Sequence, residues 1–200
     1  HVDNKDYDAA FSNRFQNKEN GRQLKVETTN QIAHYHINMA MMLQLGRWFD
    51  DLREQGVYDN TRIIIASDHG SDLRQIEELM IDYPGGRTVG LEFYYPLLLV
   101  KDFDSDQFSI SETFMTNADV PTLAFDGLVN KPVNPFTGKE INNKEKFSHE
   151  QFITLSRVYQ TDINDGNTFL PSAWASIKDD IWQASNWSFY PEDQVLADYP

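Results

Sequence analysis

The sequence predicts an α/β fold, built as a doubly wound, mostly parallel sheet with helices on both faces. One observation is the apolar run at residues 63–66, because short β-branched runs bounded by polar residues are typical of strands buried on both faces. Another is the alternation of helical and strand patterns along the chain, which is the rhythm of such sheets. With 200 residues, the chain is long enough for one domain with its own core.

A long amphipathic helix is the clearest single element. Apolar side chains recur at spacings of three and four over residues 32–52, which predicts a helix with one apolar face. Residues 28–30 offer N-caps for this helix, and Gly56 is expected directly after the last residue of the helix. His34 and His36 lie two apart within it, so they point to different faces and cannot jointly hold one metal ion.

The other elements are predicted from shorter patterns. Strand, helix, strand and helix are expected in turn over residues 62–67, 72–80, 94–100 and 119–128. Pro121 is tolerated because it lies in the first turn of the last of these helices. Further along, helical segments are predicted within residues 147–159 and over residues 173–184.

A carboxylate and an imidazole follow the first strand directly, in Ser67-Asp68-His69-Gly70. Ligands bind at the carboxyl ends of strands in open α/β sheets, so Asp68 and His69 are a candidate site by position as well as by chemistry. The alternative is a plain strand exit, because glycine after a polar residue is a common turn former.

The residues around this tetrapeptide resemble a segment of a known protein family. The segment NTRIIIASDHG, residues 60–70, closely resembles a segment of the sulfatase branch of the alkaline phosphatase superfamily. That branch includes phosphoglycerol transferases of the lipoteichoic acid synthase type. Further stretches resemble the same family in the same order, namely GRWFDDLREQG, YPLLLV, NADVPTL and PFTGK at residues 46–56, 95–100, 117–123 and 135–139. The resemblance covers residues 31–140.

The resemblance implies a metal-dependent enzyme. Asp68 and His69 would be ligands of a divalent metal ion, which could be Zn, Mn, Ca or Mg. In that family the remaining acidic ligands and a nucleophilic Thr, Ser or modified Cys belong to an N-terminal half, so no catalytic nucleophile is assigned here. The implied activity is hydrolysis or transfer of sulfate or phosphate ester groups, on lipid- or glycan-linked substrates outside the cytoplasm.

The domain organisation is expected to follow from the same resemblance. Residues 1–140 would form the C-terminal portion of a sulfatase-like α/β domain of alkaline phosphatase type, and residues 141–200 an irregular, aromatic-rich segment packed on it. The chain would be the C-terminal part of a longer protein. It is expected to be inactive without its N-terminal half, which would bring any membrane anchor.

Two further residues are candidate substrate contacts. Arg87 follows a Gly-Gly pair that would let the backbone approach an anion, and arginine binds phosphate or sulfate through two hydrogen bonds. The alternative for this loop is an ordinary glycine turn. His1 is a candidate because transferases of the family carry a substrate-binding histidine well before the strand, but the following residues differ from the family pattern.

Composition excludes some classes of partner. With 31 acidic and 17 basic residues the net charge is −14, which repels polyanions and argues against nucleic acid. The chain has no cysteine, so neither disulfides nor a cysteine-derived nucleophile arises within it. Asp102, Asp104 and Asp106 are either a hard cation site or a solvated loop.

An alternative to the enzyme is a non-catalytic family member that binds an anionic glycan or a lipid head group. The C-terminal aromatic residues, including Trp174, Trp182 and Trp187, would then form its contact surface, because rings present flat apolar faces to sugars. The competing interpretation is that these rings are buried against the rest of the fold.

Overall fold

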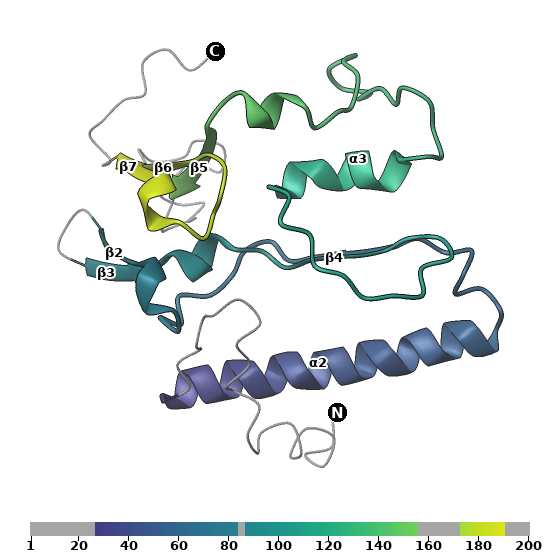
Figure 1. Cartoon of the computed structure of the whole chain (residues 1–200), viewed down its shortest axis with the longest axis horizontal. Helices are drawn as coiled ribbons and strands as arrows, with labels where there is room; N and C mark the ends of the chain where they lie inside the picture. The colour runs from purple at the N-terminus through teal and green to yellow at the C-terminus, as the bar shows by residue number, and fades with distance from the viewer. Residues whose placement is uncertain (1–26, 84–86, 156–172, 191–200) are drawn as a thin grey trace, which may run out of the picture. The chain divides into compact units, whose positions relative to one another are not determined.

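The computed structural model describes residues 27–83, 87–155 and 173–190, which form two compact units (Figure 1). The first unit holds residues 27–80 and 90–113, and the second holds residues 81–89 and the described residues from 114 to 190. Among these residues, no helix is both long and apolar enough to span a membrane.

Helix α2 (Thr29–Glu54) confirms the predicted amphipathic helix and both of its ends. Thr28 and Gln31 form a capping box, in which the Thr28 hydroxyl accepts from the Gln31 backbone N–H at 3.2 Å and the Gln31 side chain accepts from the Thr28 N–H at 3.0 Å. Gly56 follows the helix with a φ of 69°, a conformation that favours glycine. Gln31 is buried and also donates to the Leu73 carbonyl at 2.8 Å, which ties the start of the helix to a distant loop.

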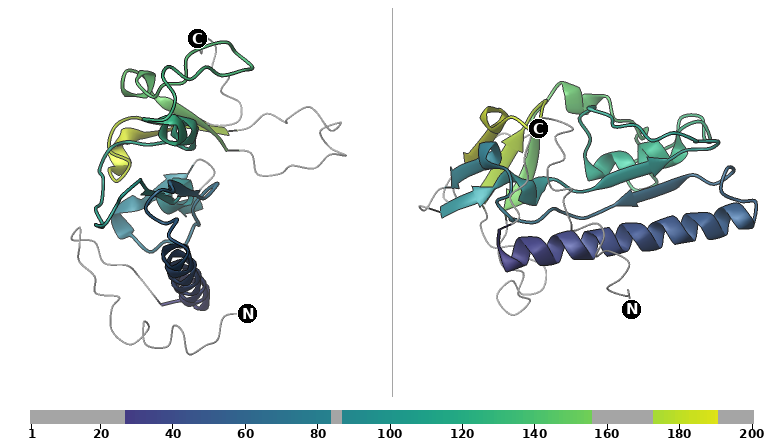
Figure 2. Two further views of the ribbon diagram at one scale, coloured as in Figure 1. Left: turned by 90° about the vertical axis from the view of Figure 1, so that its right-hand side faces the viewer. Right: turned by 60° about the horizontal axis from the view of Figure 1, so that its bottom comes forward.

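Strand β1 (Ile63–Ala66) pairs antiparallel with β4 (Leu98–Lys101), so that Ile63 lies opposite Lys101. The predicted doubly wound, mostly parallel sheet of alkaline phosphatase type is therefore wrong, since the described residues contain only small sheets and no such parallel array. Figure 1 and the right-hand view of Figure 2 show β1 and β4 as a narrow ribbon alongside α2.

The reason for this error is physical. An apolar run identifies a buried strand but does not fix the direction of its neighbour. In the antiparallel pairing the ribbon ends in an ion pair, in which Arg62 Nη2 lies 2.8 Å from Asp102 Oδ1. A parallel arrangement would place residue 102 at the far end of β1, out of reach of Arg62.

Tyr58 and Lys101 join the end of α2, the loop that follows it and β4, all within the first unit. The buried ammonium group of Lys101 donates to the backbone carbonyls of Tyr58 and Thr61, the latter at 3.0 Å, and lies 4.2 Å from the centre of the Tyr58 ring. On α2, the Arg53 guanidinium lies 4.0 Å from the same ring centre, and Phe49 packs edge-on against it at 5.6 Å. The end of α2, the following loop and β4 are thus held by one aromatic ring and one cation.

The polar helix predicted over residues 72–80 is not formed, apart from the 3-10 turn η2 (Glu77–Leu79). Carboxylates take the place of helical carbonyls as acceptors for the local N–H groups. Glu92 Oε1 accepts from the N–H of Gln75 at 2.7 Å and of Ile76 at 2.6 Å, while Asp72 Oδ1 accepts from the Gly90 N–H at 2.8 Å. These long-range bonds hold residues 72–76 in a non-helical conformation, in which Arg74 has a φ of 54°, and local propensity does not prevail.

The chain then forms a small sheet and a second 3-10 turn. β2 (Met80–Tyr83) pairs with β3 (Arg87–Gly90), and η3 (Leu91–Tyr94) follows at once. The predicted strand over residues 94–100 therefore starts late, because residue 94 belongs to η3 and β4 begins at Leu98. Leu79 and Leu91 are fully buried beside these turns.

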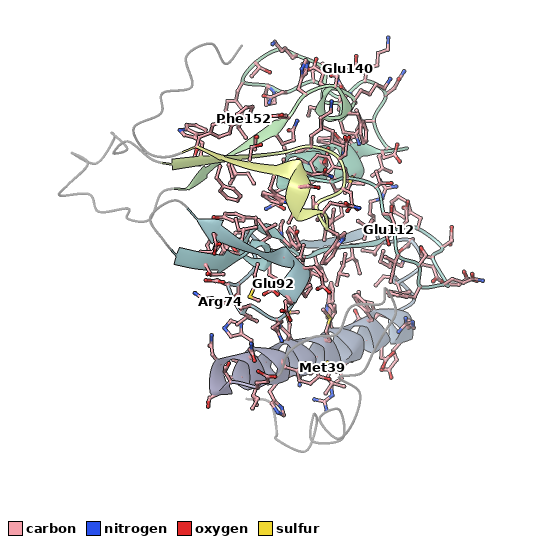
Figure 3. All side chains as sticks on the ribbon, turned by 60° about the vertical axis from the view of Figure 1, so that its left-hand side comes forward. Met39, Arg74, Glu92, Glu112, Glu140 and Phe152 are labelled. Atoms are coloured by element: carbon pink, nitrogen blue, oxygen red, sulfur yellow. The ribbon has the colours of Figure 1, made fainter. Side chains whose placement is uncertain are left out.

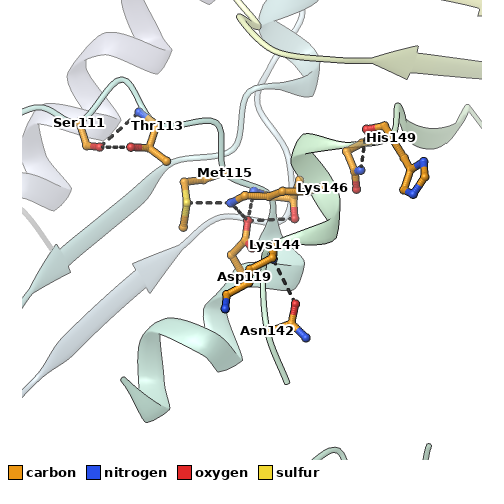
Figure 4. A network of polar contacts seen from close by, with 10 residues as sticks. Ser111, Thr113, Met115, Asp119, Asn142, Lys144, Lys146 and His149 are labelled. Carbon is orange, nitrogen blue, oxygen red and sulfur yellow. Dashed lines mark hydrogen bonds and ion pairs between the residues drawn. The ribbon is translucent and has the colours of Figure 1, made fainter. Parts of the chain in front are cut away.

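The second unit contains the predicted helix around Pro121, shorter than expected. The 3-10 turn η4 (Asn117–Asp119) leads into α3 (Val120–Phe125), with Pro121 in its first turn. Asp119 is buried, and its Oδ2 accepts from the Thr116 N–H at 2.7 Å and from Lys146 Nζ at 2.8 Å (Figure 4). Lys146 comes from η5 (Glu145–Phe147) and also contacts Met115 Sδ at 3.1 Å.

A three-stranded antiparallel sheet replaces the two helices predicted near the C-terminus. β5 (Gln151–Leu155), β6 (Ala173–Ile177) and β7 (Trp187–Tyr190) pair in the order β5-β6-β7, and the 3-10 turn η6 (Ala184–Asn186) precedes β7. The helical prediction fails where the structure describes these segments, because β5 and β7 carry mainly β-branched or aromatic residues, which pack well on a pleated surface once a neighbouring strand is present; residues 156–159 of the first segment lie outside the described residues. Ala175 and Ile177 of the central strand form the core of this sheet.

The aromatic residues of this sheet are largely packed. Trp187 is buried, and its indole N–H donates to the Ile181 carbonyl at 3.0 Å. Trp174 and Trp182 are partly exposed. Trp187 also stacks on Phe189, with ring centres 6.5 Å apart.

The buried ion pair of the second unit gives a stability prediction. Replacing Lys146 by methionine leaves the Asp119 carboxylate buried without its cation, which we expect to lower the free energy of unfolding by about 3 to 5 kcal/mol. Chemical denaturation of the full chain measures this. Lys144→Met, at an exposed position two residues away, is the matched control and should change stability by less than about 0.5 kcal/mol. Equal losses in both variants would contradict a specific role for the buried pair.

Candidate metal site at the end of β1

The segment that follows β1 is fixed to the chain before β4. The Ser67 N–H donates to the Leu97 carbonyl at 2.9 Å, and the Ser67 hydroxyl accepts from the Leu97 N–H at 2.7 Å. The side-chain oxygen thus continues the ladder one step beyond the strand. This bond defines the direction in which Asp68 and His69 leave the ribbon.

Gly70 closes the segment by a very close backbone approach. Its N–H donates to the Phe93 carbonyl at 2.8 Å. A Cβ atom at this position would lie 2.0 Å from the carbonyl oxygen of Glu92 and 2.9 Å from that of Tyr95, distances that no side chain can occupy. The glycine of the tetrapeptide is therefore required by packing against η3.

Asp68 and His69 lie side by side at the surface. The side chains are 89% and 57% exposed, and Asp68 Oδ2 lies 3.7 Å from His69 Nε2. The other oxygen of Asp68 accepts from the His69 backbone N–H at 2.9 Å, which holds the carboxylate next to the ring. Two ligand atoms bound tetrahedrally to one zinc ion lie roughly 3.3 Å apart, so a small movement would allow both to bind the same cation.

The imidazole of His69 is oriented by contacts on two sides. Its Nδ1 lies 2.6 Å from the Gly70 carbonyl oxygen, and because a carbonyl only accepts, Nδ1 carries the proton in the neutral ring. Nε2 is then the unprotonated nitrogen, which is the one facing Asp68. The ring also stacks on Phe93, with centres 5.0 Å apart and planes inclined by 30°. A backbone carbonyl that fixes the tautomer is the usual outer-shell partner of a metal-binding histidine.

The site can therefore supply two ligands to a divalent cation, a carboxylate oxygen from Asp68 and an imidazole nitrogen from His69. Within the described ranges, no group of three or more His, Cys, Asp or Glu side chains is placed to hold a metal ion. Two protein ligands leave such a cation with most of its water shell, so binding by Asp68 and His69 alone is weak.

Glu92, labelled in Figure 3, belongs to η3, the turn whose Phe93 contacts His69 and Gly70. Besides the two N–H groups that bond its Oε1, its second oxygen is buried and has no hydrogen-bond partner among the described residues. Burial raises the pKa of the Glu92 carboxyl; backbone donors at Ile76, Gln75 and Arg74 oppose this, and the charge of Asp72 adds to it.

The structure does not test the two predicted substrate contacts. His1 lies outside the described residues. Arg87 is the first residue of β3, and only its backbone is described. Both assignments remain predictions.

Asp102, the first of the three aspartates in the loop after β4, has a structural role. Asp102 Oδ1 accepts from Arg62 Nε at 2.9 Å and Nη2 at 2.8 Å, and the Phe103 N–H donates to the same oxygen at 2.7 Å. The bonds to Arg62, followed by the one to Phe103, hold the pKa of the Asp102 carboxyl below its usual value. Asp102 thus neutralises Arg62 at the end of the ribbon.

Sequence reasoning missed Phe93, whose ring and carbonyl contact His69 and Gly70, and Glu92 in the same turn. They lie more than twenty residues further along the chain, in a turn with no chemical motif of its own. The one available signal was Gly70, because a glycine beside polar ligands often marks a place where another stretch of backbone comes close.

Comparison with known protein families, with curated proteins and with solved structures found no match to this chain. Any function of this chain is therefore inferred from its residues and their geometry.

The contact at Gly70 predicts a strong effect of one methyl group. Gly70→Ala forces a Cβ against backbone atoms of η3, which cannot rotate away, so we expect a loss of more than about 2 kcal/mol in the free energy of unfolding. Gly46→Ala is the control, because Gly46 lies within α2 with nothing within 4 Å, and there alanine should stabilise by about 0.5 to 1 kcal/mol. Thermal or chemical denaturation measures both. Similar stabilities for the two variants would exclude the close approach.

The raised pKa of Glu92 predicts the direction in which the free energy of unfolding changes with pH. The pKa of this carboxyl is 4.5 in the unfolded chain and higher in the folded state. The protonated carboxyl therefore stabilises the fold fully at pH values below 4.5, and this stabilisation is lost as the pH rises through the folded-state pKa. The wild type should therefore lose stability relative to Glu92→Gln as the pH increases from about 4 to 7. Denaturation curves at several pH values test this, with Glu78→Gln in η2, an exposed position, as control. A difference that changes in the opposite direction would contradict the assignment.

Proposed function

We propose that the chain contributes to a metal-dependent enzyme that hydrolyses or transfers sulfate or phosphate ester groups. The proposal combines the resemblance of residues 60–70 to the sulfatase family with the arrangement of Asp68 and His69. The observation that carries it is the hydrogen bond between His69 Nδ1 and the Gly70 carbonyl, which leaves Nε2 as an acceptor 3.7 Å from Asp68 Oδ2.

In this proposal the protein holds the cation through Asp68 Oδ2 and His69 Nε2. A bound divalent cation would neutralise charge on an ester oxygen and help to deprotonate a hydroxyl group. The ring of His69 is kept in place by Phe93, and the Asp68 carboxylate by the His69 backbone N–H. Both ligands would therefore be preorganised, so little side-chain freedom is lost when the cation binds.

The substrate, partners and location are proposals on the same ground. The substrate would be a sulfate or phosphate ester, linked to a lipid or a glycan, and the site would lie outside the cytoplasm. The nucleophile and the remaining metal ligands would come from an N-terminal half of the same protein. Arg87 and His1 would contact the anionic group of the ester.

Metal binding is the first test. Titration of the full chain with Mn²⁺, followed by paramagnetic broadening of histidine signals in NMR spectra, should show broadening of His69 first. Asp68→Asn and His69→Gln should each weaken Mn²⁺ binding by about tenfold or more, because each removes one of two protein ligands. His149→Gln and Asp106→Asn, which change an exposed histidine and an exposed aspartate elsewhere, are matched controls and should leave the affinity unchanged.

Activity is the second readout of the same variants. Full-length protein with its metal should turn over a generic phosphodiester or sulfate ester, and both ligand substitutions should abolish turnover. If Mn²⁺ binds the wild type and all four variants alike, Asp68 and His69 are only a strand exit and the proposal fails.

A further inference from the structure

Helix α2 has an apolar stripe on the side opposite its half-buried face. Ile37, Met41 and Trp48 are 68%, 43% and 45% exposed, and Gln44 between them is exposed as well. At about 100° per residue these four positions fall within roughly 60° of one another around the helix axis. The half-buried residues Tyr35, Met39 and Met42 lie on the other side; Met39 is labelled on α2 in Figure 3.

The spacing of the stripe fits another helix. Its members follow one another by four, three and four residues, which is the seam of a two-stranded coiled coil. A single polar residue in such a seam, here Gln44, is a common device for fixing register. An apolar loop or a flat sheet would not need this spacing.

The charge pattern favours a second copy of this chain as the partner. The chain carries 31 acidic residues, yet residues 28–49 contain none, and Arg47 is the one Lys or Arg among them. Two copies with a net charge of −14 each can therefore approach along this stretch without close contact between carboxylates.

We propose that α2 pairs with α2 of a second copy, antiparallel, along Ile37, Met41, Gln44 and Trp48. In this arrangement Ile37 faces Trp48 of the partner copy and Met41 faces its Gln44, so that a large side chain meets a smaller one. A parallel pair would bring Asp50, Asp51 and Glu54 of both copies together at one end. The antiparallel pair separates them and places each set near the N-terminal half of the other helix, where the helix dipole favours negative charge.

The interface is short. From residue 37 to residue 48 the helix rises about 16 Å, which buries less area than the standard interface of about 1,200 to 2,000 Å². We therefore expect a weak dimer, with a Kd of roughly micromolar to millimolar. This inference concerns assembly and does not depend on the proposed function.

Sedimentation equilibrium of the full chain tests the inference. The average mass of the wild type should rise towards that of a dimer as concentration increases from about 10 μM to 1 mM. Met41→Glu should raise the protein concentration at which half of the chains are dimeric by at least tenfold, and circular dichroism should show that α2 is retained. Phe108→Glu, which changes an 84% exposed apolar residue of the same unit, is the matched control and should behave as the wild type.

The orientation has its own test. The double variant Met41→Glu with Gln44→Lys should dimerise again, because in the antiparallel pair each new glutamate faces a new lysine. In a parallel pair like charges would face each other, so failure of the double variant to dimerise would overturn the proposal. A wild type that stays monomeric over the whole range would also overturn it. Binding of that monomer to phosphatidylcholine vesicles, lost in Met41→Glu, would assign the stripe to a lipid surface instead.

Discussion

The buried ammonium group of Lys101 is the interaction on which the first unit depends. Its carbonyl acceptors belong to the loop after α2, its own backbone ends β4, and the ring it covers is also held by Arg53 and Phe49 of α2. A buried cation has to be matched by nearby acceptors or it would not be tolerated. Because these acceptors are backbone carbonyls, they tie the loop after α2 to the end of β4, and β1 begins directly after that loop.

Sequence reasoning succeeded where the signal is local and failed where it depends on distant partners. The cap at Thr28 and the glycine at position 56 are local, and α2 has the predicted ends. The antiparallel direction of β1 against β4, which brings Arg62 to Asp102, is revealed by no pattern within either strand. Likewise, residues 72–76 would suit a helix but are held in an irregular, non-helical path by the carboxylates of Asp72 and Glu92.

The same division applies to the candidate site. Asp68 and His69 could be identified as candidates from the sequence because they are adjacent and follow an apolar run. The geometry of these two side chains could not be predicted from the sequence, because it depends on Phe93 and on the backbone of η3. The packing requirement at Gly70 exists whether or not the site binds a metal, so this glycine supports the fold as much as any chemistry.

The two strands of the ribbon are separated by a long stretch of chain. Residue 63 pairs with residue 101, so β1 is synthesised 38 residues (101 − 63) before the position that it pairs with. During that interval an apolar strand has both edges unpaired, a state that favours wrong pairing with other chains. Non-local pairing of this kind also slows folding, because a long loop has to close before any contact rewards it. Expression of this protein should therefore be sensitive to chaperones and to the rate of translation between residues 66 and 101.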